Sequence, residues 1–206
     1  MAFSGIGSPA GRELWEAAVR VQLFAWIVFF LLIFVNHARV TRRRHRLGGD
    51  CGPSFRAPAS MLGLFVEGLA VALAWRFRRV GPEQAAAGWV LLAIALAAAA
   101  LLFLGWALCH LGQQWRVKAV VTADHELITS GPYGIVRHPV FASMLWMLAA
   151  NALVVSELWA GWCALAVYVA GTEIRIRAED RLLARRFPET FATYRSRVRA
   201  YLPFVR

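Results

Sequence analysis

Residues that can carry out chemistry are concentrated in two polar stretches of an otherwise apolar chain. The first stretch, residues 110–139, contains His125 and His138, and the second, after residue 171, contains Arg175 and Glu179. Because Arg175 and Glu179 are four residues apart, they share one face of a helix. Such a pair is compatible with a binding site or with a solvated salt bridge, and each histidine is also compatible with an ordinary interfacial position. Spacing alone therefore does not identify a reaction.

The first polar stretch ends at a boundary that favours anion binding. Gly131-Pro132 predicts a turn, and Pro139 disfavours helix at His138 while fitting the first turn of the next helix. Arg137 and His138 are therefore expected at a helix N-terminus. Free amide groups and the helix dipole there can receive a carboxylate or a similar anion.

The elements that must position these residues are membrane helices. Of the 206 residues, 59% are hydrophobic and only 17% are charged, which is too apolar for an ordinary soluble domain. A span needs about 20 apolar residues. About five segments qualify, namely residues 15–36, 58–76, 85–109, 139–155 and 157–174. The sequence therefore predicts an all-α integral membrane protein whose last span continues as an amphipathic helix.

The distribution of basic residues predicts the orientation of these helices. The formal charge is +11, and 18 of the 23 Lys and Arg residues fall in the first loop, the third loop and the C-terminal tail. The positive-inside rule then places the N-terminus outside and the C-terminal helical segment, with both polar stretches, in the cytoplasm. Because a basic excess in a membrane protein reports loop orientation, nucleic acid is not expected as a partner.

Glu67 and the three cysteines belong to no motif. Glu67 lies in the middle of the second span, where an ionised carboxylate costs at least about 2.5 kcal/mol unless it is paired or protonated. It is either a substrate or subunit contact, or a protonated residue bonded within the bundle. Cys51, Cys109 and Cys163 lack zinc-ligand spacing and are expected to pack, so no metal site is predicted. The neutral, Gly-rich start predicts that the first apolar run is retained rather than cleaved.

The C-terminal half of the chain resembles the catalytic region of the isoprenylcysteine carboxyl methyltransferase family. The resemblance is carried, in order, by LGQQW from Leu111, HELITSGPYGIVRHPVF from His125, RIRAEDRLLARRF from Arg175, FATYRSRV from Phe191, and YLP from Tyr201. It implies a catalytic region at 110–206 behind three N-terminal transmembrane helices at 1–109. It also implies S-adenosylmethionine as methyl donor and a lipophilic acceptor, such as an isoprenylcysteine carboxylate, that enters from the bilayer.

The resemblance also implies roles for individual residues. Arg175 would hold the acceptor's carboxylate, and Glu179 would orient Arg175 or pair with the donor's amino group. In-line methyl transfer needs alignment and desolvation more than acid or base catalysis. The residues expected to contact the donor are His125, Glu126, Leu127, Ile128, Tyr133, His138, Pro139, Val140, Phe141 and Glu179.

The strings depart from the family pattern at a few positions and are shared with other families. Phe141 replaces a usual Tyr, and Ala200 stands where an Arg is usual. Phospholipid N-methyltransferases and membrane sterol reductases carry similar strings. Two functions of other classes are therefore alternatives to a methyltransferase. One is an NADPH-dependent membrane reductase, and the other is a non-catalytic lipid-binding scaffold whose arginine-rich tail docks on anionic headgroups.

Overall fold

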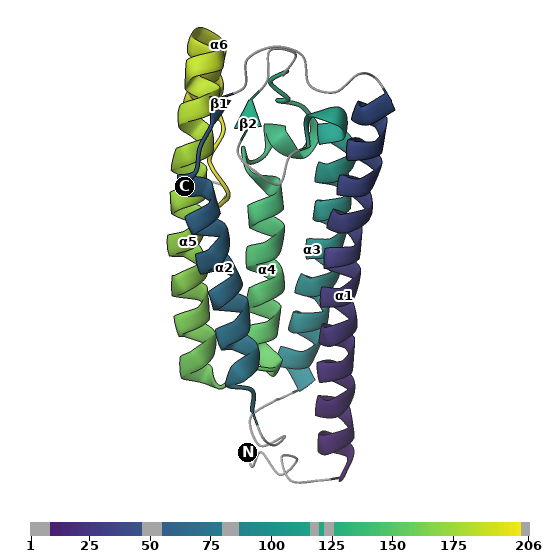
Figure 1. The fold of residues 1–206 in the computed structure, drawn as a ribbon. Coiled ribbons are helices and arrows are strands. Elements are labelled where there is room, and N and C mark those ends of the chain that lie inside the picture. Colours follow the sequence, from purple (N-terminus) through teal and green to yellow (C-terminus); the bar gives the residue numbers. More distant parts are fainter. Residues whose placement is uncertain (1–8, 47–54, 80–86, 116–119, 122–125, 203–206) are drawn as a thin grey trace.

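The described part of the protein is a bundle of five long helices lying side by side (Figure 1). The structure, a computed structural model, describes residues 9–46, 55–79, 87–115, 120–121 and 126–202. Short 3-10 turns η1 and η2 and a two-residue antiparallel strand pair, β1 with β2, lie in the connections. The elements are α1 (Pro9–Arg46), β1 (Phe55–Arg56), α2 (Ala59–Arg76), α3 (Ala87–Leu111), η1 (Gly112–Gln114), β2 (Val120–Val121), η2 (Gly131–Gly134), α4 (Pro139–Val154), α5 (Leu158–Arg186) and α6 (Pro188–Arg197).

Three helices in the described part of the chain are long and apolar enough to cross a membrane. These are α1, α2 and α3, and they expose large apolar side chains such as Phe24, Phe65 and Leu102 on their outer faces. Helix α4 is apolar but has only 16 residues, which gives about 24 Å against a hydrocarbon core of about 30 Å. The all-α fold with helices of membrane-spanning length and apolarity is confirmed for the described residues, whereas the fourth and fifth spans stay predictions.

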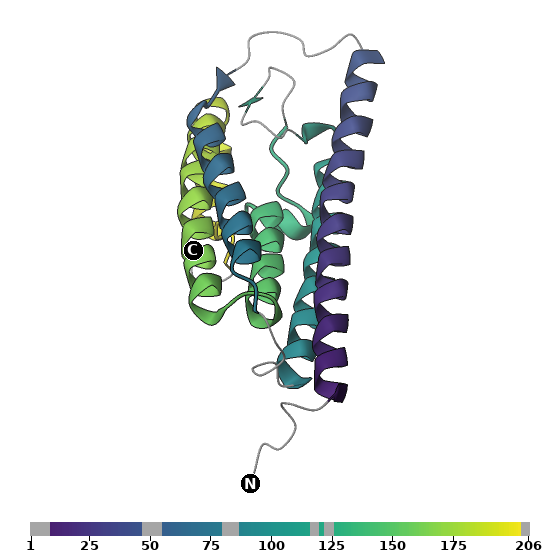
Figure 2. The ribbon, with the colours of Figure 1, turned by 60° about the horizontal axis from the view of Figure 1, so that its bottom comes forward.

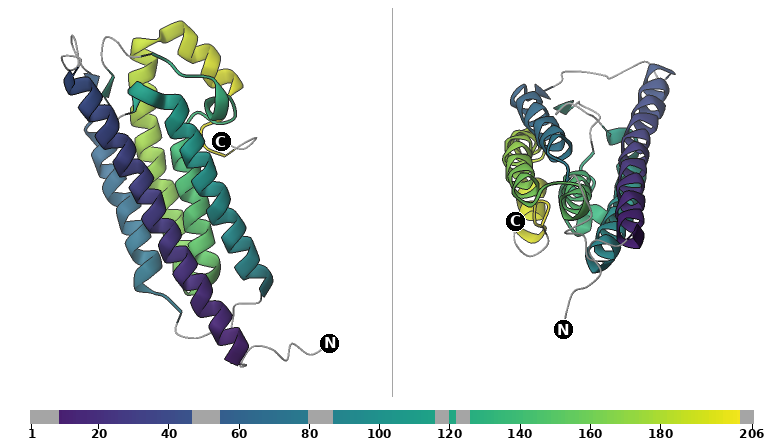
Figure 3. Two further views of the ribbon diagram at one scale, coloured as in Figure 1. Left: turned by 90° about the vertical axis from the view of Figure 1, so that its right-hand side faces the viewer. Right: turned by 90° about the horizontal axis from the view of Figure 1, so that it is seen from below.

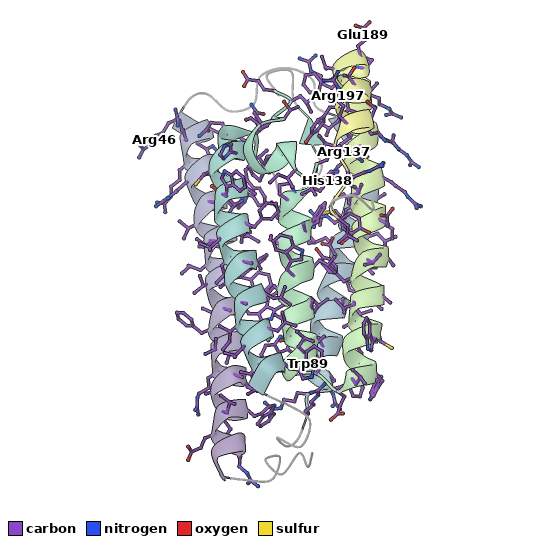
Figure 4. All side chains as sticks on the ribbon, turned by 180° about the vertical axis from the view of Figure 1, so that it is seen from behind. Arg46, Trp89, Arg137, His138, Glu189 and Arg197 are labelled. Carbon is purple, nitrogen blue, oxygen red and sulfur yellow. The ribbon has the colours of Figure 1, made fainter. Side chains whose placement is uncertain are left out.

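Helix α4 lies between two helix pairs, α1 with α3 on one side and α2 with α5 on the other (Figure 2, Figure 3). The buried stripe of α3 repeats every three or four residues and is made mostly of alanine, which brings α3 close to α4 and α1. The chain passes up and down the bundle, so one end collects the end of α1 and the starts of α2 and α4. Figure 4 shows Arg46, Arg137, His138 and Arg197 toward this end and Trp89 toward the opposite end.

Two glycines set the close approach of α2 and α5. A Cβ atom at Gly63 would lie 2.4 Å from Arg175 Cγ and 2.6 Å from the Gly171 carbonyl oxygen. A Cβ atom at Gly171 would lie 2.9 Å from the Gly63 carbonyl oxygen. The helices therefore touch backbone to backbone, and this contact places Glu67, one turn after Gly63, beside Arg175.

Replacing Gly63 by alanine is expected to lower the free energy of unfolding by about 1–3 kcal/mol, because neither the Gly171 carbonyl nor the packed stem of Arg175 can yield easily. The control is Gly68→Ala in the same helix. A Cβ atom there meets nothing within 4 Å, so alanine should be neutral or stabilising by up to about 1 kcal/mol. Denaturation of both variants in detergent checks this, and equal effects would contradict the close contact.

Candidate active site

The Gly-Pro-Tyr-Gly turn η2 places Tyr133 at the open end of the bundle. Gly131 begins the turn with φ +59, and a Cβ atom there would lie 2.4 Å from the His110 ring. The Tyr194 hydroxyl on α6 donates to the Tyr133 carbonyl at 2.6 Å, so α6 fixes the turn from outside. The turn and α6 therefore form one unit at this end of the bundle.

The segment after α6 fixes the residues that precede α4. The Arg137 N–H donates to the Arg199 carbonyl and the His138 N–H to the Ala200 carbonyl, both at 2.7 Å. Tyr201 is buried, and its hydroxyl donates to Glu173 Oε1 on α5 at 3.2 Å. These bonds explain why the family-like strings near the C-terminus accompany the Arg-His-Pro string: the tail holds His138 in place at the start of α4.

Asp180 joins Arg137 and His138 in a buried polar network. Its Oδ2 accepts from Arg137 Nη2 and its Oδ1 faces His138 Nε2, both at 3.1 Å. The other ring nitrogen of His138 lies 3.5 Å from Glu179 Oε2. Burial lowers the pKa of His138, but Asp180 and Glu179 more than offset this, so the pKa is raised above 6.5. Burial alone would raise the pKa of Asp180. The hydrogen bonds and charges of His138 and Arg137 lower it by more, so this pKa falls below 3.8.

These two shifts predict how stability depends on pH. The raised pKa of His138 gives stability that is fully present below 6.5 and is lost as pH rises through the folded-state value. The lowered pKa of Asp180 gives stability that is present above 3.8 and is lost as pH falls through its folded-state value. The melting temperature in detergent should therefore decline as pH rises above 6.5, and His138→Gln should flatten that decline. An unchanged slope in this variant would contradict the network.

Arg175 is the second centre of charge in the site. Its Nη1 donates to Glu67 Oε2 at 2.7 Å, and its Nη2 lies 3.8 Å from Glu179 Oε1. The Thr172 hydroxyl donates to the other oxygen of Glu67 at 3.1 Å. The guanidinium lies over the Phe141 ring, 4.6 Å from its centroid, and the same ring stacks on His138. Phe141 therefore packs against both Arg175 and His138.

A single cavity brings the predicted residues together. It is lined by residues of all five long helices, and its wall combines charged side chains with apolar ones such as Phe30, Ile33, Leu64 and Met144. His125 lies outside the described residues. The other predicted residues all line this cavity, namely Glu126, Leu127, Ile128, Tyr133, His138, Pro139, Val140, Phe141, Arg175 and Glu179.

The cavity also contains or depends on residues that the motifs did not identify. Asp180 lies behind His138 in the string RIRAEDRLLARRF, between Glu179 and Arg181, and as one of several charged residues of this amphipathic stretch it gave no separate signal. Trp115 and Tyr194 line the cavity from the strings LGQQW and FATYRSRV. Glu67 had a signal, a carboxylate in mid-span, and the structure places it against Arg175 rather than at a subunit surface.

Residues 91–185 match the model of the isoprenylcysteine carboxyl methyltransferase family. These residues form a domain of that family. The domain runs from α3 through most of α5 and includes every described residue predicted for the site. The resemblance seen in the sequence strings is therefore confirmed, and it assigns the region to a methyltransferase family.

Curated relatives are similar over about half of the chain or less. A cobalt-zinc-cadmium resistance protein (CzcN) of Cupriavidus metallidurans is 36% identical over 102 residues, 48% of this chain and 46% of that protein. A nickel-cobalt-cadmium resistance protein (NccN) of Alcaligenes xylosoxydans xylosoxydans is 34% identical over 48% of this chain and 47% of its own length. An uncharacterised protein (YpbQ) of Bacillus subtilis is 34% identical over 38% of this chain and 46% of its own. The match therefore spans about half the length of these relatives.

Proposed function

We propose that this protein is an integral membrane methyltransferase that transfers a methyl group from S-adenosylmethionine to a lipophilic acceptor. One observation carries the proposal: residues from 126–128, 133–141 and 175–179 line one cavity whose wall combines charged side chains with apolar ones. A water-soluble donor and a lipid acceptor need such a combination, since each must reach the same point from a different phase.

The lining residues fit the donor's chemistry. A sulfonium and an amino group are both cationic, and carboxylates such as Glu179 and Glu126 and the faces of Phe141 and Tyr133 attract cations. The donor's carboxylate suits the start of α4, where no side chain caps the first backbone amide groups of the helix. When bound, the donor would supply an activated methyl group to the acceptor's nucleophile.

The protein's own residues would supply alignment and exclusion of water. The Asp180 network fixes the His138 ring, and Tyr168 donates to the Phe141 carbonyl at 2.9 Å, which fixes the start of α4 from α5. Arg175 is held over Phe141 by Glu67, so its guanidinium has one defined position. In-line transfer depends on such fixed geometry more than on proton transfer.

We extend the proposal to the membrane arrangement. Helices α4 and α5 would complete five spans by packing against α2 and α3. The basic residues at the ends of α1 and α5 would place the cavity in the cytoplasm and the N-terminus outside. The division into a transmembrane part at 1–109 and a catalytic part at 110–206 follows the family match only in part, because the match begins within α3.

Two of the relatives are named for metal resistance, and that property belongs to those proteins. Within the described ranges, no group of three or more His, Cys, Asp or Glu residues lies close enough together to hold a metal ion. The methyltransferase proposal therefore stands on the family domain and the cavity.

Binding of the donor tests the proposal directly. Purified protein in detergent should bind labelled S-adenosylmethionine, and Glu179→Ala and His138→Ala should each weaken binding by about tenfold or more, as expected for lost hydrogen bonds to charged groups. Glu189→Gln, in α6 and exposed, is the matched control and should bind normally. Binding of NADPH in place of the donor would favour a reductase, and no binding of either would favour a scaffold.

A further inference from the structure

Arg175, the residue expected to hold the acceptor's carboxylate, already holds a carboxylate that the protein supplies. Glu67 Oε2 lies 2.7 Å from Arg175 Nη1, and Thr172 donates to Glu67 Oε1 at 3.1 Å. Glu67 is 2% exposed and Arg175 is 8% exposed. Both oxygens of Glu67 therefore have partners, and the carboxylate belongs to the wall of the cavity.

An acceptor carboxylate could reach this face of Arg175 only by displacing Glu67. A displaced Glu67 would be a buried carboxylate without its cation, which is strongly unfavourable. Helix α2 cannot easily move Glu67 away from Arg175, because α2 touches α5 backbone to backbone at Gly63 and Gly171, one turn away. Glu67 therefore competes with any carboxylate that approaches Arg175.

The other basic side chains of the described cavity lining are engaged in the same way. Arg137 and His138 both bond to Asp180 at 3.1 Å, and His138 also faces Glu179. Each of these basic side chains thus has a carboxylate of the protein beside it. A carboxylate acceptor would enter this part of the cavity without a cation of its own, whereas an uncharged group would not need one.

We propose that the acceptor presents a protic, uncharged nucleophile, a hydroxyl group or an amine in its neutral form, at the head of a lipid chain, and that Glu67 excludes carboxylates. This inference rests on the proposed methyltransferase function. It makes Glu67, which lies in α2 and outside the family domain, the residue that determines the class of acceptor.

The proposed transfer balances without a further reactant. A lone pair of the acceptor's oxygen or nitrogen forms the bond to the methyl carbon, and the electron pair of the breaking C–S bond stays on sulfur, which becomes a neutral thioether. The acceptor's proton passes to a carboxylate of the cavity. Glu179 suits this role because its side chain is 25% exposed, so that it can release the proton to water.

The test uses hexadecanoate, hexadecanol and hexadecylamine, which share one chain and differ in the head group. Binding to the full-length protein in detergent is followed by tryptophan fluorescence, since Trp115 lines the cavity, and methylation is followed with labelled donor. Wild-type protein should bind hexadecanoate at least about tenfold more weakly than hexadecanol or hexadecylamine and should methylate only the latter two. Comparison of those two identifies oxygen or nitrogen as the nucleophile.

Glu67→Gln is the decisive variant because it keeps the shape of Glu67 and removes its charge. It should bind hexadecanoate at least about tenfold more tightly than the wild type, through the freed Arg175 guanidinium. Glu16→Gln removes a carboxylate from an exposed Arg pair in α1 and should change nothing. Equal binding of hexadecanoate and hexadecanol by the wild type would overturn the inference even if Glu67→Gln did not fold. Failure to bind the donor in the same samples would instead count against the methyltransferase.

Discussion

Replacing Arg175 by alanine is expected to lower the free energy of unfolding by about 3–5 kcal/mol and to abolish methyl transfer. The large effect has a specific cause: the substitution leaves Glu67, 2% exposed, without the cation that lies 2.7 Å from it. It also removes the charge that packs on Phe141. Denaturation in detergent gives the stability, and labelled donor gives the transfer.

A double variant separates these two effects. Glu67→Gln combined with Arg175→Met removes both buried charges, so most of the lost stability should return, because a buried ion pair replaced by groups of similar volume is often close to neutral. Methyl transfer should stay abolished, since the guanidinium is still missing. An Arg175→Ala variant with the same free energy of unfolding as the wild type would contradict the buried ion pair between Glu67 and Arg175.

Replacing Asp180 by asparagine is expected to weaken donor binding by about tenfold to a hundredfold, the effect of losing hydrogen bonds to charged groups. Asparagine keeps the shape of the side chain, but it removes the negative charge that His138 and Arg137 share at 3.1 Å. The pKa of His138 should fall toward or below its ordinary value of 6.5. Burial lowers this pKa, and without the Asp180 charge less remains to raise it. Titration with the donor measures the affinity.

A second readout shows that the effect passes through His138 rather than through general loss of structure. The NMR resonance of the His138 ring can be assigned by comparison with His138→Gln. In the Asp180→Asn variant it should titrate at a lower pH than in the wild type. Asp180→Glu keeps the charge and should restore a raised pKa at least in part. Normal donor affinity with an unshifted His138 titration would show that Asp180 does not position this ring.

Much of the fold followed from the sequence because apolar segments of bilayer length have few alternatives. Every helix of the bundle overlaps a segment expected from apolar runs, and Pro139 begins α4 as the proline predicted. The C-terminal extension of the fifth segment is also present, since α5 continues to Arg186. Residue patterns could not predict that the tail after α6 bonds back to Arg137 and His138, because those contacts involve backbone groups of distant segments.

The site was predicted as a set of residues but not as a network. The strings supplied the residues because they are read along the chain, and the cavity collects all of them that the structure describes. The partner of Arg175 was not predicted, since Glu67 is more than a hundred positions away and its contact depends on the close approach at Gly63 and Gly171. Long-range pairing of this kind depends on which helix faces touch, and a single hydropathy pattern does not specify that.

Transfer of a labelled methyl group to lipid tests the central claim most directly. Purified protein is incubated with S-adenosylmethionine carrying a labelled methyl group and with a total membrane lipid extract, and the lipid fraction is analysed by mass. The account predicts that label enters the lipid fraction with wild-type protein and with Glu189→Gln but not with Arg175→Ala. Donor that binds without any label reaching lipid, or equal transfer by Arg175→Ala, would contradict a lipid methyltransferase built on this cavity.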